Sequence, residues 1–342
     1  MKRFLSVLLL LCALTSFAQE PLLKTKWNQT HPYNMMCPAD PMENYAHCYT
    51  GCPATAMGQI INYLRTTNDT RFDDGDDYTA NYAGRQFHID DDWEMYQFPS
   101  FPQLNTMLDS ADAVFQRGGE LNDALVAAVI FASGVACKQV YTASSSYGSG
   151  TFNVNQAYQA YLRFGFTDCK LFNEPSEEMY EILIDNLEAG YPAHLAVMNN
   201  AATSGHNVVV DGYRESDNKY HINFGWGGSG DKWYSIPDPT GFGHGWTKIE
   251  GIIVDIIPAN AAVQEVATNQ AIEVYPNPAT DVIYLTNLPF ETVDYSIFNV
   301  LGQNVIAGST SGNISVADFE KGLYILQIKG EKHLETVKFM VR

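Results

Sequence analysis

Three residues in this chain, a cysteine, a histidine and an asparagine, are spaced in a way that supports acyl transfer. Cys52 comes just ahead of a stretch with helical periodicity, and His206 follows about 150 residues later, at the start of an apolar strand pattern. Asn223 lies in the next strand pattern. A thiolate attacks a carbonyl carbon when a histidine takes the thiol proton and a third group orients the imidazole ring. We therefore predict that Cys52 is a nucleophile, His206 a general base and Asn223 the residue that orients the ring.

The residues around Cys52 predict that it sits at the N-terminus of a helix. Pro53 suits the first turn of a helix, where its missing N–H is not needed, and apolar residues recur at helical spacing up to Arg65. The positive end of the helix dipole and the unpaired N–H groups at that end favour a thiolate. On this stretch alone, a buried cysteine or one half of a disulfide is an equal alternative.

The elements that must position these residues change character near Pro192. Helical patterns precede it, and alternating apolar and polar residues typical of strands follow it. The predicted helices are 101–109, 122–136, 154–164 and 176–189, and the predicted strands are 193–198, 207–213, 219–224, 233–236 and 249–257. Helices followed by consecutive strands favour an α+β domain that ends near Pro258, with a cleft between the helical half and the strand half.

Three connecting segments carry further expectations. Residues 21–34 have turn signals typical of an extended chain leading to the Cys52 helix, and they include Gln29, whose side-chain amide lies upstream of the nucleophile. The Asp- and Gly-rich run 69–92 predicts a solvated acidic loop, with calcium binding as the alternative. The Ser- and Gly-rich run 144–150 predicts a surface loop beside a cleft, or an ordinary connector.

The N-terminus and the charge of the chain predict an exported protein. A basic start, an apolar run over 4–14 and a small-residue cleavage site at 16–18 indicate a signal peptide over residues 1–18. No later apolar stretch is long enough to span a bilayer, so we expect no transmembrane segment. A net charge of −19 disfavours nucleic acid as a partner.

Five of the six cysteines follow the signal peptide, and an odd number in an exported protein leaves at least one thiol unpaired or paired in trans. Cys52 is our candidate for the free thiol. Cys37 with Cys48 is a plausible short-loop disulfide, and Cys137 with Cys169 is a second candidate pair, although the sequence does not fix the pairing.

The end of the chain has a different character from the rest. Residues 259–270 are small and polar, which indicates a linker between a domain over 19–258 and a second domain over 271–342. Short alternating segments at 272–275, 282–285, 293–299, 303–307, 323–328 and 336–341 predict a small all-β sandwich. This part has no cysteine, so we expect no catalysis there.

Four ordered motifs in residues 21–258 resemble those of streptopain-like cysteine peptidases, whose fold is papain-like and two-lobed. They are WNQxxPYN at 27–34, GCxATAMxQI at 51–60, GHxxVxDGY at 205–213 and YHxNxGWGG at 220–228. The resemblance implies Cys52 as nucleophile, His206 as general base and acid, and Asn223 as the residue that orients the imidazole. It further implies that Gln29 donates to the oxyanion beside the Cys52 backbone N–H, and that Trp226 shields the histidine.

Three positions depart from the pattern of that family. Pro53 stands where the family usually has an aliphatic residue, and Phe224 where it commonly has a tryptophan. Asn207 stands where the family frequently has an alanine beside the histidine. The first two departures remove no functional group, whereas Asn207 changes the shape expected for the cleft.

The last domain resembles the sorting domain of type IX secretion substrates. The resemblance rests on YPNP at 275–278, NVLGQ at 299–303, GLY at 322–324 and the basic-tipped end. It implies the type IX secretion machinery as a partner, and a product that is either released or attached to the outer-membrane surface. The alternative is a generic adhesion module.

These observations together predict a secreted cysteine endopeptidase that hydrolyses proteins or peptides through a thioester, with no metal or organic cofactor. Two other functions are compatible with the same residues. One is an acyltransferase or amidase that uses the same Cys–His pair, and the other is a catalytically silent surface-binding protein of the same fold.

Overall fold

The computed structural model describes residues 20–258, 272–286, 293–300, 302–329 and 334–342. The chain divides into two compact units, Met1–Ala261 and Ala262–Arg342, and each is described by itself. The predicted signal peptide and the predicted linker lie outside the described residues. In the part of the chain that the structure describes, no helix is long and apolar enough to cross a membrane.

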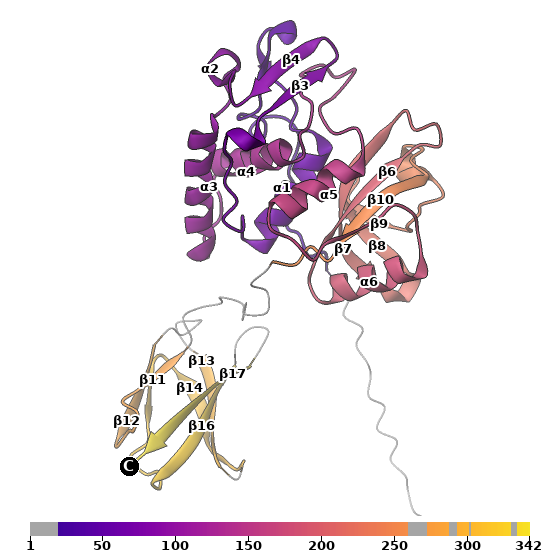
Figure 1. Ribbon diagram of the computed structural model, residues 1–342. Coiled ribbons are helices and arrows are strands. Elements are labelled where there is room, and N and C mark those ends of the chain that lie inside the picture. The colour runs from indigo at the N-terminus through magenta and orange to yellow at the C-terminus, as the bar shows by residue number, and fades with distance from the viewer. Residues whose placement is uncertain (1–19, 259–271, 287–292, 301, 330–333) are drawn as a thin grey trace, which may run out of the picture. The chain divides into compact units, whose positions relative to one another are not determined.

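Helices build one half of the first unit (Figure 1). They are α1 (Cys52–Leu64), α2 (Trp93–Tyr96), α3 (Phe101–Gln116), α4 (Asp123–Ala136) and α5 (Val154–Arg163). The apolar stripe of α1 packs against α4, which is buried along most of its length. The two backbones approach so closely that a Cβ added at Gly58 would lie 2.9 Å from Cγ1 of Ile130. Glycine at this position therefore lets α1 pack tightly on α4.

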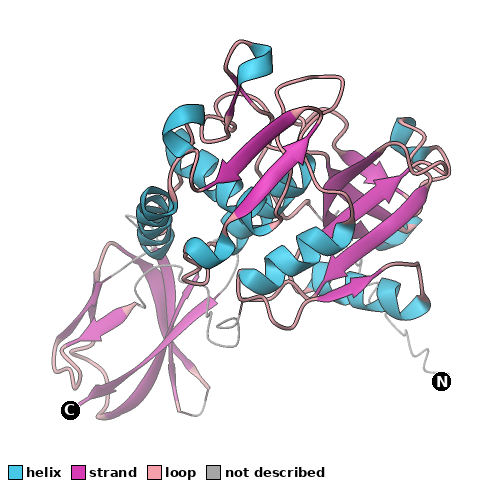
Figure 2. Ribbon diagram, turned by 45° about the horizontal axis from the view of Figure 1, so that its top comes forward, coloured by secondary structure: helices cyan, strands magenta, loops and turns pink. Residues whose placement is uncertain are grey.

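An antiparallel sheet builds the other half. Its strand order is β5-β10-β6-β7-β8-β9, and α6 (Glu177–Glu188) packs on one of its faces (Figures 1 and 2). The strands are β5 (Lys170–Phe172), β6 (Ala193–Met198), β7 (Gly205–Arg214), β8 (Lys219–Asn223), β9 (Lys232–Tyr234) and β10 (Lys248–Val254). Ser176 caps α6 by accepting a hydrogen bond from the Met179 N–H at 3.1 Å.

The two faces of the sheet belong to two different hydrophobic cores. Along β7, Val208 and Val210 pack into the core beneath α6, whereas Val209 between them packs into the core that contains α1. This alternation follows from the two-residue period of a strand. The helical half and the strand half are therefore joined through the middle of the sheet, and β7 runs along that junction.

The N-terminal segment runs along this junction. The Leu22 and Leu23 N–H groups donate to the Asp211 carbonyl oxygen at 2.7 Å and to the Asp211 carboxylate at 3.1 Å, respectively. Further along, the Gly227 N–H donates to the Trp27 carbonyl oxygen at 2.9 Å. The segment thereby joins β7 to the loop after β8.

The acidic run 69–92 is more structured than predicted. It contains the hairpin β3 (Tyr78–Tyr82) and β4 (Arg85–Ile89), in which Ala80, Phe87 and Ile89 are buried and alternate with exposed residues. The flanking aspartates obscured this short alternation. In the described residues no group of three or more His, Cys, Asp or Glu is placed to hold a metal ion, so the structure gives the calcium alternative no support.

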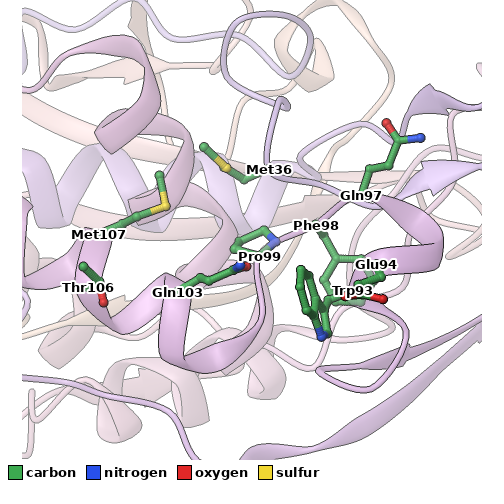
Figure 3. Close-up of a pocket in the computed structure, with 9 residues that line it drawn as sticks. All are labelled: Met36, Trp93, Glu94, Gln97, Phe98, Pro99, Gln103, Thr106 and Met107. Carbon is green, nitrogen blue, oxygen red and sulfur yellow. The ribbon is translucent and has the colours of Figure 1, made fainter.

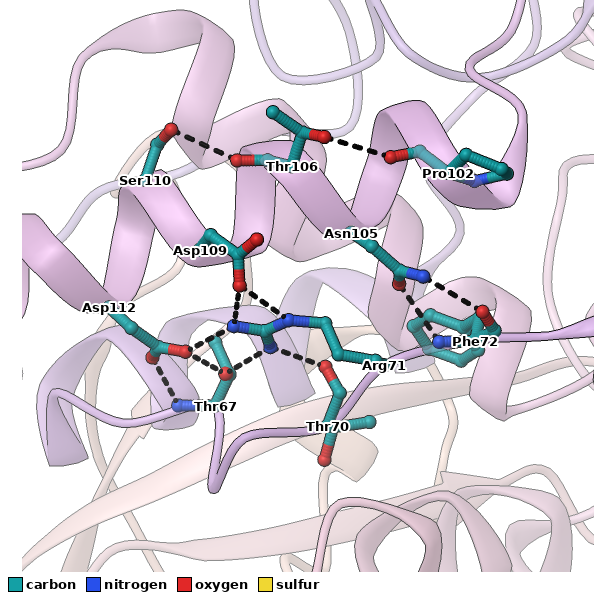
Figure 4. A network of polar contacts seen from close by, with 10 residues as sticks. All are labelled: Thr67, Thr70, Arg71, Phe72, Pro102, Asn105, Thr106, Asp109, Ser110 and Asp112. Atoms are coloured by element: carbon teal, nitrogen blue, oxygen red, sulfur yellow. Dashed lines mark hydrogen bonds and ion pairs between the residues drawn. The ribbon is translucent and has the colours of Figure 1, made fainter.

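A polar network attaches the segment after α1 to α3 (Figure 4). The Arg71 guanidinium donates to Asp109 at 2.7 Å and to Asp112 at 3.0 Å. Asp112 also accepts from the Thr67 N–H at 3.0 Å, and the Asn105 side chain pairs with both backbone groups of Phe72. These contacts fix the chain between α1 and the hairpin of β3 and β4.

The disulfides that the sequence suggested are not found. The structure gives Cys37, Cys48, Cys52, Cys137 and Cys169 as free thiols, and all except Cys52 are buried. Cys37 and Cys48 flank the short pair β1 (Ala39–Asp40) and β2 (Ala46–His47) and pack as small apolar side chains in the helical core.

The second unit is all-β. One sheet has the order β11-β12-β15 and the other the order β14-β13-β16-β17, and they share one apolar core. The strands are β11 (Glu273–Tyr275), β12 (Val282–Thr286), β13 (Val293–Asn299), β14 (Asn304–Thr310), β15 (Asn313–Ser315), β16 (Gly322–Lys329) and β17 (Leu334–Val341). The predicted fold class, an α+β region followed by an all-β region, is confirmed.

Candidate active site

Cys52 is the first residue of α1, at the position that the sequence predicted. Gly51 before it has a φ of 80°, and a Cβ there would lie 2.6 Å from Oε1 of Gln139. The same Gln139 side chain donates to the Thr50 carbonyl oxygen at 2.6 Å. The positive φ and the close Gln139 side chain therefore both require glycine at position 51. The bond from Gln139 to Thr50 holds the turn before Cys52 in place.

His206 is the second residue of β7, and it is 5% exposed. Its Nε2 lies 2.9 Å from the Phe224 carbonyl oxygen. A carbonyl oxygen can only accept a hydrogen bond, so Nε2 carries the proton of the neutral ring. The lone pair is then on Nδ1, which makes Nδ1 the nitrogen that can take a proton.

Aromatic rings enclose His206. Trp226 lies with its ring centroid 4.5 Å from that of His206, Trp246 at 5.3 Å and Phe224 at 6.0 Å. The sequence predicted the shielding role of Trp226 but missed Trp246, whose indole N–H donates to Ser204 at 3.0 Å. Trp246 follows a Gly-rich run without periodicity, so no pattern in the sequence marked it.

The hydrogen bonds of the Asn223 side chain go to groups other than the His206 ring, which differs from the prediction. Its Oδ1 accepts from Nε2 of Gln59 at 3.0 Å and from the Gly225 N–H at 3.0 Å, and its Nδ2 donates to the Thr25 carbonyl oxygen at 2.9 Å. An asparagine just before a glycine turn readily bonds the backbone two residues on, and here that local bond occupies the oxygen. Asn223 therefore fixes the turn whose next carbonyl, that of Phe224, holds His206.

Gln59 is a buried polar link beside the site that the sequence analysis did not single out. It is fully buried in α1, and its Oε1 accepts from the Thr25 hydroxyl at 2.8 Å while its Nε2 donates to Asn223. A glutamine within an apolar helical stripe was the available signal, because a buried amide needs partners. It links the nucleophile helix to the end of β8.

The backbone of Gln29 is bonded to the segment just before Cys52. Its carbonyl oxygen accepts from the Thr50 N–H at 3.1 Å, two residues before Cys52. Within the described residues, the structure gives no hydrogen bond from the Gln29 side chain to Cys52, so the predicted oxyanion role stays a prediction.

A cleft of about 620 Å³ contains both Cys52 and His206. Asn207, Glu250 and the run 146–152 also line it. The predicted loop 144–150 therefore does border a cleft. The other three residues predicted for catalysis do not line it, and they are Gln29, Asn223 and Trp226.

Burial opposes charge on both reacting groups. Burial raises the pKa of the Cys52 thiol, hydrogen bonds from Asn207 lower it, and the Glu250 carboxylate raises it. Burial lowers the pKa of His206 to about 4, while the hydrogen bond to the Phe224 carbonyl works in the opposite direction. A thiolate and an imidazolium here consequently depend on specific contacts for their stability.

A second cavity of about 630 Å³ lies apart from this cleft, beside α2 and the start of α3 (Figure 3). Its lining is largely apolar and includes Met36, Trp93, Phe98, Pro99 and Met107. None of the residues predicted for catalysis lines it. This second cavity therefore contains none of the residues on which the predicted chemistry depends.

A thiol at a helix N-terminus and a buried imidazole with a free lone pair, in one cleft of an α+β unit, define a cysteine-dependent acyl-transfer enzyme. Comparison with known proteins narrows this class. The sequence pattern of the peptidase C10 family matches residues 27–234, and the chain belongs to this family of cysteine peptidases.

Curated relatives agree with this assignment. The chain is 28% identical over 297 residues to thiol protease/hemagglutinin PrtT of Porphyromonas gingivalis, and the match covers 82% of this chain. It is 25% identical over 259 residues to streptopain of Streptococcus pyogenes, with 68% of this chain covered. The chain matches only 30% of the length of the first relative and 60% of the second.

A solved structure is also similar. Interpain A, a cysteine protease of Prevotella intermedia, is 24% identical, with a TM-score of 0.49 over 69% of this chain and 94% of that one. Separately, a secretion system C-terminal sorting domain matches residues 273–342. This match confirms the predicted sorting domain and implies export by type IX secretion.

Proposed function

We propose that this C10 peptidase is a secreted endopeptidase that cleaves protein substrates with Cys52 as nucleophile and His206 as general base and acid. The observation that carries the proposal is the placement of these two side chains in one cleft, with the proton of His206 held on Nε2 by the Phe224 carbonyl. That bond leaves Nδ1 free to accept the thiol proton.

The proposed reaction has two halves. His206 takes the Cys52 proton, the sulfur attacks the peptide carbonyl carbon, and the tetrahedral oxyanion collapses as His206 returns the proton to the leaving amine. Water, deprotonated by His206, then attacks the thioester and releases the acid and the thiol. No metal or organic cofactor takes part in these reaction steps.

Three supporting roles belong to the proposal. The Cys52 N–H lies at the unpaired N-terminal end of α1, where it is suited to donate to the oxyanion, and we assign the second donor to the Gln29 side chain. Trp226 covers one face of His206 and would exclude water from its hydrogen bond to Phe224. Asn223 orients His206 indirectly, through the turn that carries the Phe224 carbonyl.

The location of the exported enzyme forms a further part of the proposal. The sorting domain supports passage across the outer membrane, with the enzyme released or held at the cell surface. The partners proposed are therefore the type IX secretion machinery during export and protein or peptide substrates afterwards.

The test compares the full-length protein with Cys52→Ala on casein in the presence of dithiothreitol, with Cys169→Ala as a matched control. Iodoacetamide labelling located by mass spectrometry reports which thiol reacts. We expect labelling at Cys52, and cleavage that is lost in Cys52→Ala but kept in the control.

Two other outcomes point to other functions. Labelling at Cys52 without cleavage of any protein would favour an acyltransferase or amidase. Neither labelling nor cleavage would contradict the catalytic proposal and favour a silent binding protein.

A further inference from the structure

A line of hydrogen bonds runs from the helical core to the nucleophile. The Tyr161 hydroxyl of α5 lies 3.1 Å from Nδ1 of His194 on β6, and Nε2 of His194 lies 2.8 Å from Oδ1 of Asn207 on β7. The Nδ2 of Asn207 then donates to Sγ of Cys52 at 3.7 Å. The catalytic scheme above uses none of Tyr161, His194 or Asn207.

The protons along this line can be assigned from the chemistry of its members. The Oδ1 of Asn207 can only accept, so the proton of His194 is on Nε2 and its Nδ1 lone pair accepts from the Tyr161 hydroxyl. Burial lowers the pKa of His194 to about 4, so the ring is neutral at neutral pH. Both Tyr161 and His194 are fully buried, which leaves them no water to exchange these bonds with.

The orientation of the Asn207 amide and this tautomer of His194 match each other. With its oxygen fixed by the His194 N–H, the amide must present its NH₂ group toward the sulfur. The reverse orientation would place a carbonyl oxygen against Cys52, which would repel a thiolate. A neutral His194 with its proton on Nε2 is therefore the form that holds the amide with its NH₂ group toward the sulfur.

We propose that Asn207 is a catalytic residue that stabilises the Cys52 thiolate through its side-chain N–H, and that His194 and Tyr161 position its amide for this purpose. The proposal rests on the proposed role of Cys52 as nucleophile. It gives a function to a polar side chain whose oxygen and nitrogen both have defined partners.

Other titratable groups face the same atoms and must be accounted for. His206 on β7 and Glu250 on β10 line the cleft with Cys52, and the Cys137 thiol at the end of α4 lies within electrostatic reach. The Glu250 carboxylate acts against the thiolate, whereas hydrogen bonds from the backbone and from the side chain of Asn207 act for it, and Asn207→Ala removes only the side-chain one. Replacing Glu250 and replacing Asn207 should therefore shift the reactivity of Cys52 in opposite directions.

The test measures the rate of Cys52 alkylation by iodoacetamide against pH in the full-length protein, with the label quantified on the Cys52 peptide by mass spectrometry. In Asn207→Ala we expect the midpoint of the profile to rise by about one pH unit, so that the rate at about pH 6 falls about tenfold. Glu250→Gln is expected to lower the midpoint. Asn81→Ala, an exposed asparagine on β3, is the matched control and should leave it unchanged.

Substitutions at Tyr161 and His194 distinguish a role in orienting the Asn207 amide from a role in packing alone. Tyr161→Phe removes one hydroxyl, frees the tautomer of His194 and should raise the midpoint by less than Asn207→Ala does. His194→Leu should raise it as Asn207→Ala does, and His194→Gln, which keeps a donor toward Asn207, should restore most of the loss. Thermal unfolding of each variant confirms that the folded protein is being compared, and Tyr161→Phe tests the proposal if the larger changes do not fold.

The outcomes distinguish this inference from the proposed function. An unchanged or lowered midpoint in Asn207→Ala overturns the inference, even in an enzyme that cleaves casein. A raised midpoint in a protein that cleaves no substrate would support the role of Asn207 and contradict the peptidase proposal.

Discussion

The Phe224 carbonyl oxygen accepts the Nε2–H of His206 at 2.9 Å, so a backbone group holds the proposed general base. The side chain of Asn223, one residue earlier, fixes the turn that contains this carbonyl. The backbone atom is independent of residue type at position 224, which explains how phenylalanine is tolerated there. It also means that the orientation of His206 depends on the conformation of the turn.

Asn223→Ala should therefore lower stability and activity together. The change removes the partner of the Gln59 Nε2, of the Gly225 N–H and of the Thr25 carbonyl oxygen, which costs on the order of 1–3 kcal/mol of unfolding free energy for each unsatisfied group. Urea unfolding and casein cleavage, measured on the same preparations, check this expectation. Asn186→Ala, which breaks a partly buried pair with Asp255 outside the cleft lining, should lower stability with cleavage retained. Full stability with lost cleavage in Asn223→Ala would contradict the structural role.

Removal of the Trp246 ring should raise the pKa of His206. Burial is the main cause of the low value, about 4, and Trp246→Ala admits water to one face of the imidazole. The pKa should then move toward the ordinary value of about 6.5 for histidine. Titration of the ring by NMR measures the shift directly. Trp233→Ala, beside His221 on a neighbouring strand, is the control and should leave His206 unchanged.

Two buried neutral histidines should make the first unit sensitive to mild acid. His194 and His206 have pKa values of about 4 in the folded protein, against about 6.5 in an unfolded chain. The unfolded state thus binds more protons between these values, so stability is full above about pH 6.5 and declines as the pH falls toward about 4. The loss is on the order of 3 kcal/mol for each histidine.

Urea midpoints at about pH 7 and about pH 4.5 measure this loss for the wild type. In His194→Gln the decline should be about half as large, because one of the two titrating groups is gone. An equal decline in both proteins would show that other groups cause it.

The ion pair between Asp40 and Arg85 should contribute strongly to stability. Both side chains are almost fully buried, 2.9 Å apart, and Asp40 also accepts from the Ala143 N–H at 2.9 Å. Asp40→Asn leaves the buried guanidinium with only the more exposed Glu43 carboxylate, 3.3 Å away, as counter-charge, which should cost about 3 kcal/mol. Asp109→Asn, in the more exposed pair with Arg71, should cost less than about 1 kcal/mol in the same urea experiment. Similar losses in the two variants would contradict the importance of burial.

Much of this architecture was predictable because it is encoded by local periodicity. The helix at Cys52 has a proline in its first turn and a clear apolar stripe, and β7 is an apolar run that begins beside His206. The hairpin of β3 and β4 was missed because only three buried apolar residues mark it within an acidic run. Local patterns thus predicted the elements that bury large continuous faces.

The parts of the site that were missed depend on tertiary contacts. Asn223 has several possible partners in the sequence, and only the fold shows that Gln59 and Gly225 occupy its oxygen. Trp246 and His194 lie in segments whose sequence pattern is compatible with ordinary packing. Their roles follow from which atoms they meet, and a single sequence does not contain that information.

The alternation of β7 has one more consequence, which concerns insertions and deletions. His206 lies on the same face of β7 as Val208 and Val210. Asn207 lies on the opposite face, with Val209. The imidazole and the amide therefore come from adjacent residues on opposite faces of one strand. One residue inserted or deleted within this strand would exchange the two sides and present each group to the wrong core. In the loop 199–204 side chains do not alternate between two faces of a sheet, so a change of length there does not exchange faces. Insertions and deletions should therefore accumulate in that loop during evolution, while the number of residues in the strand stays the same.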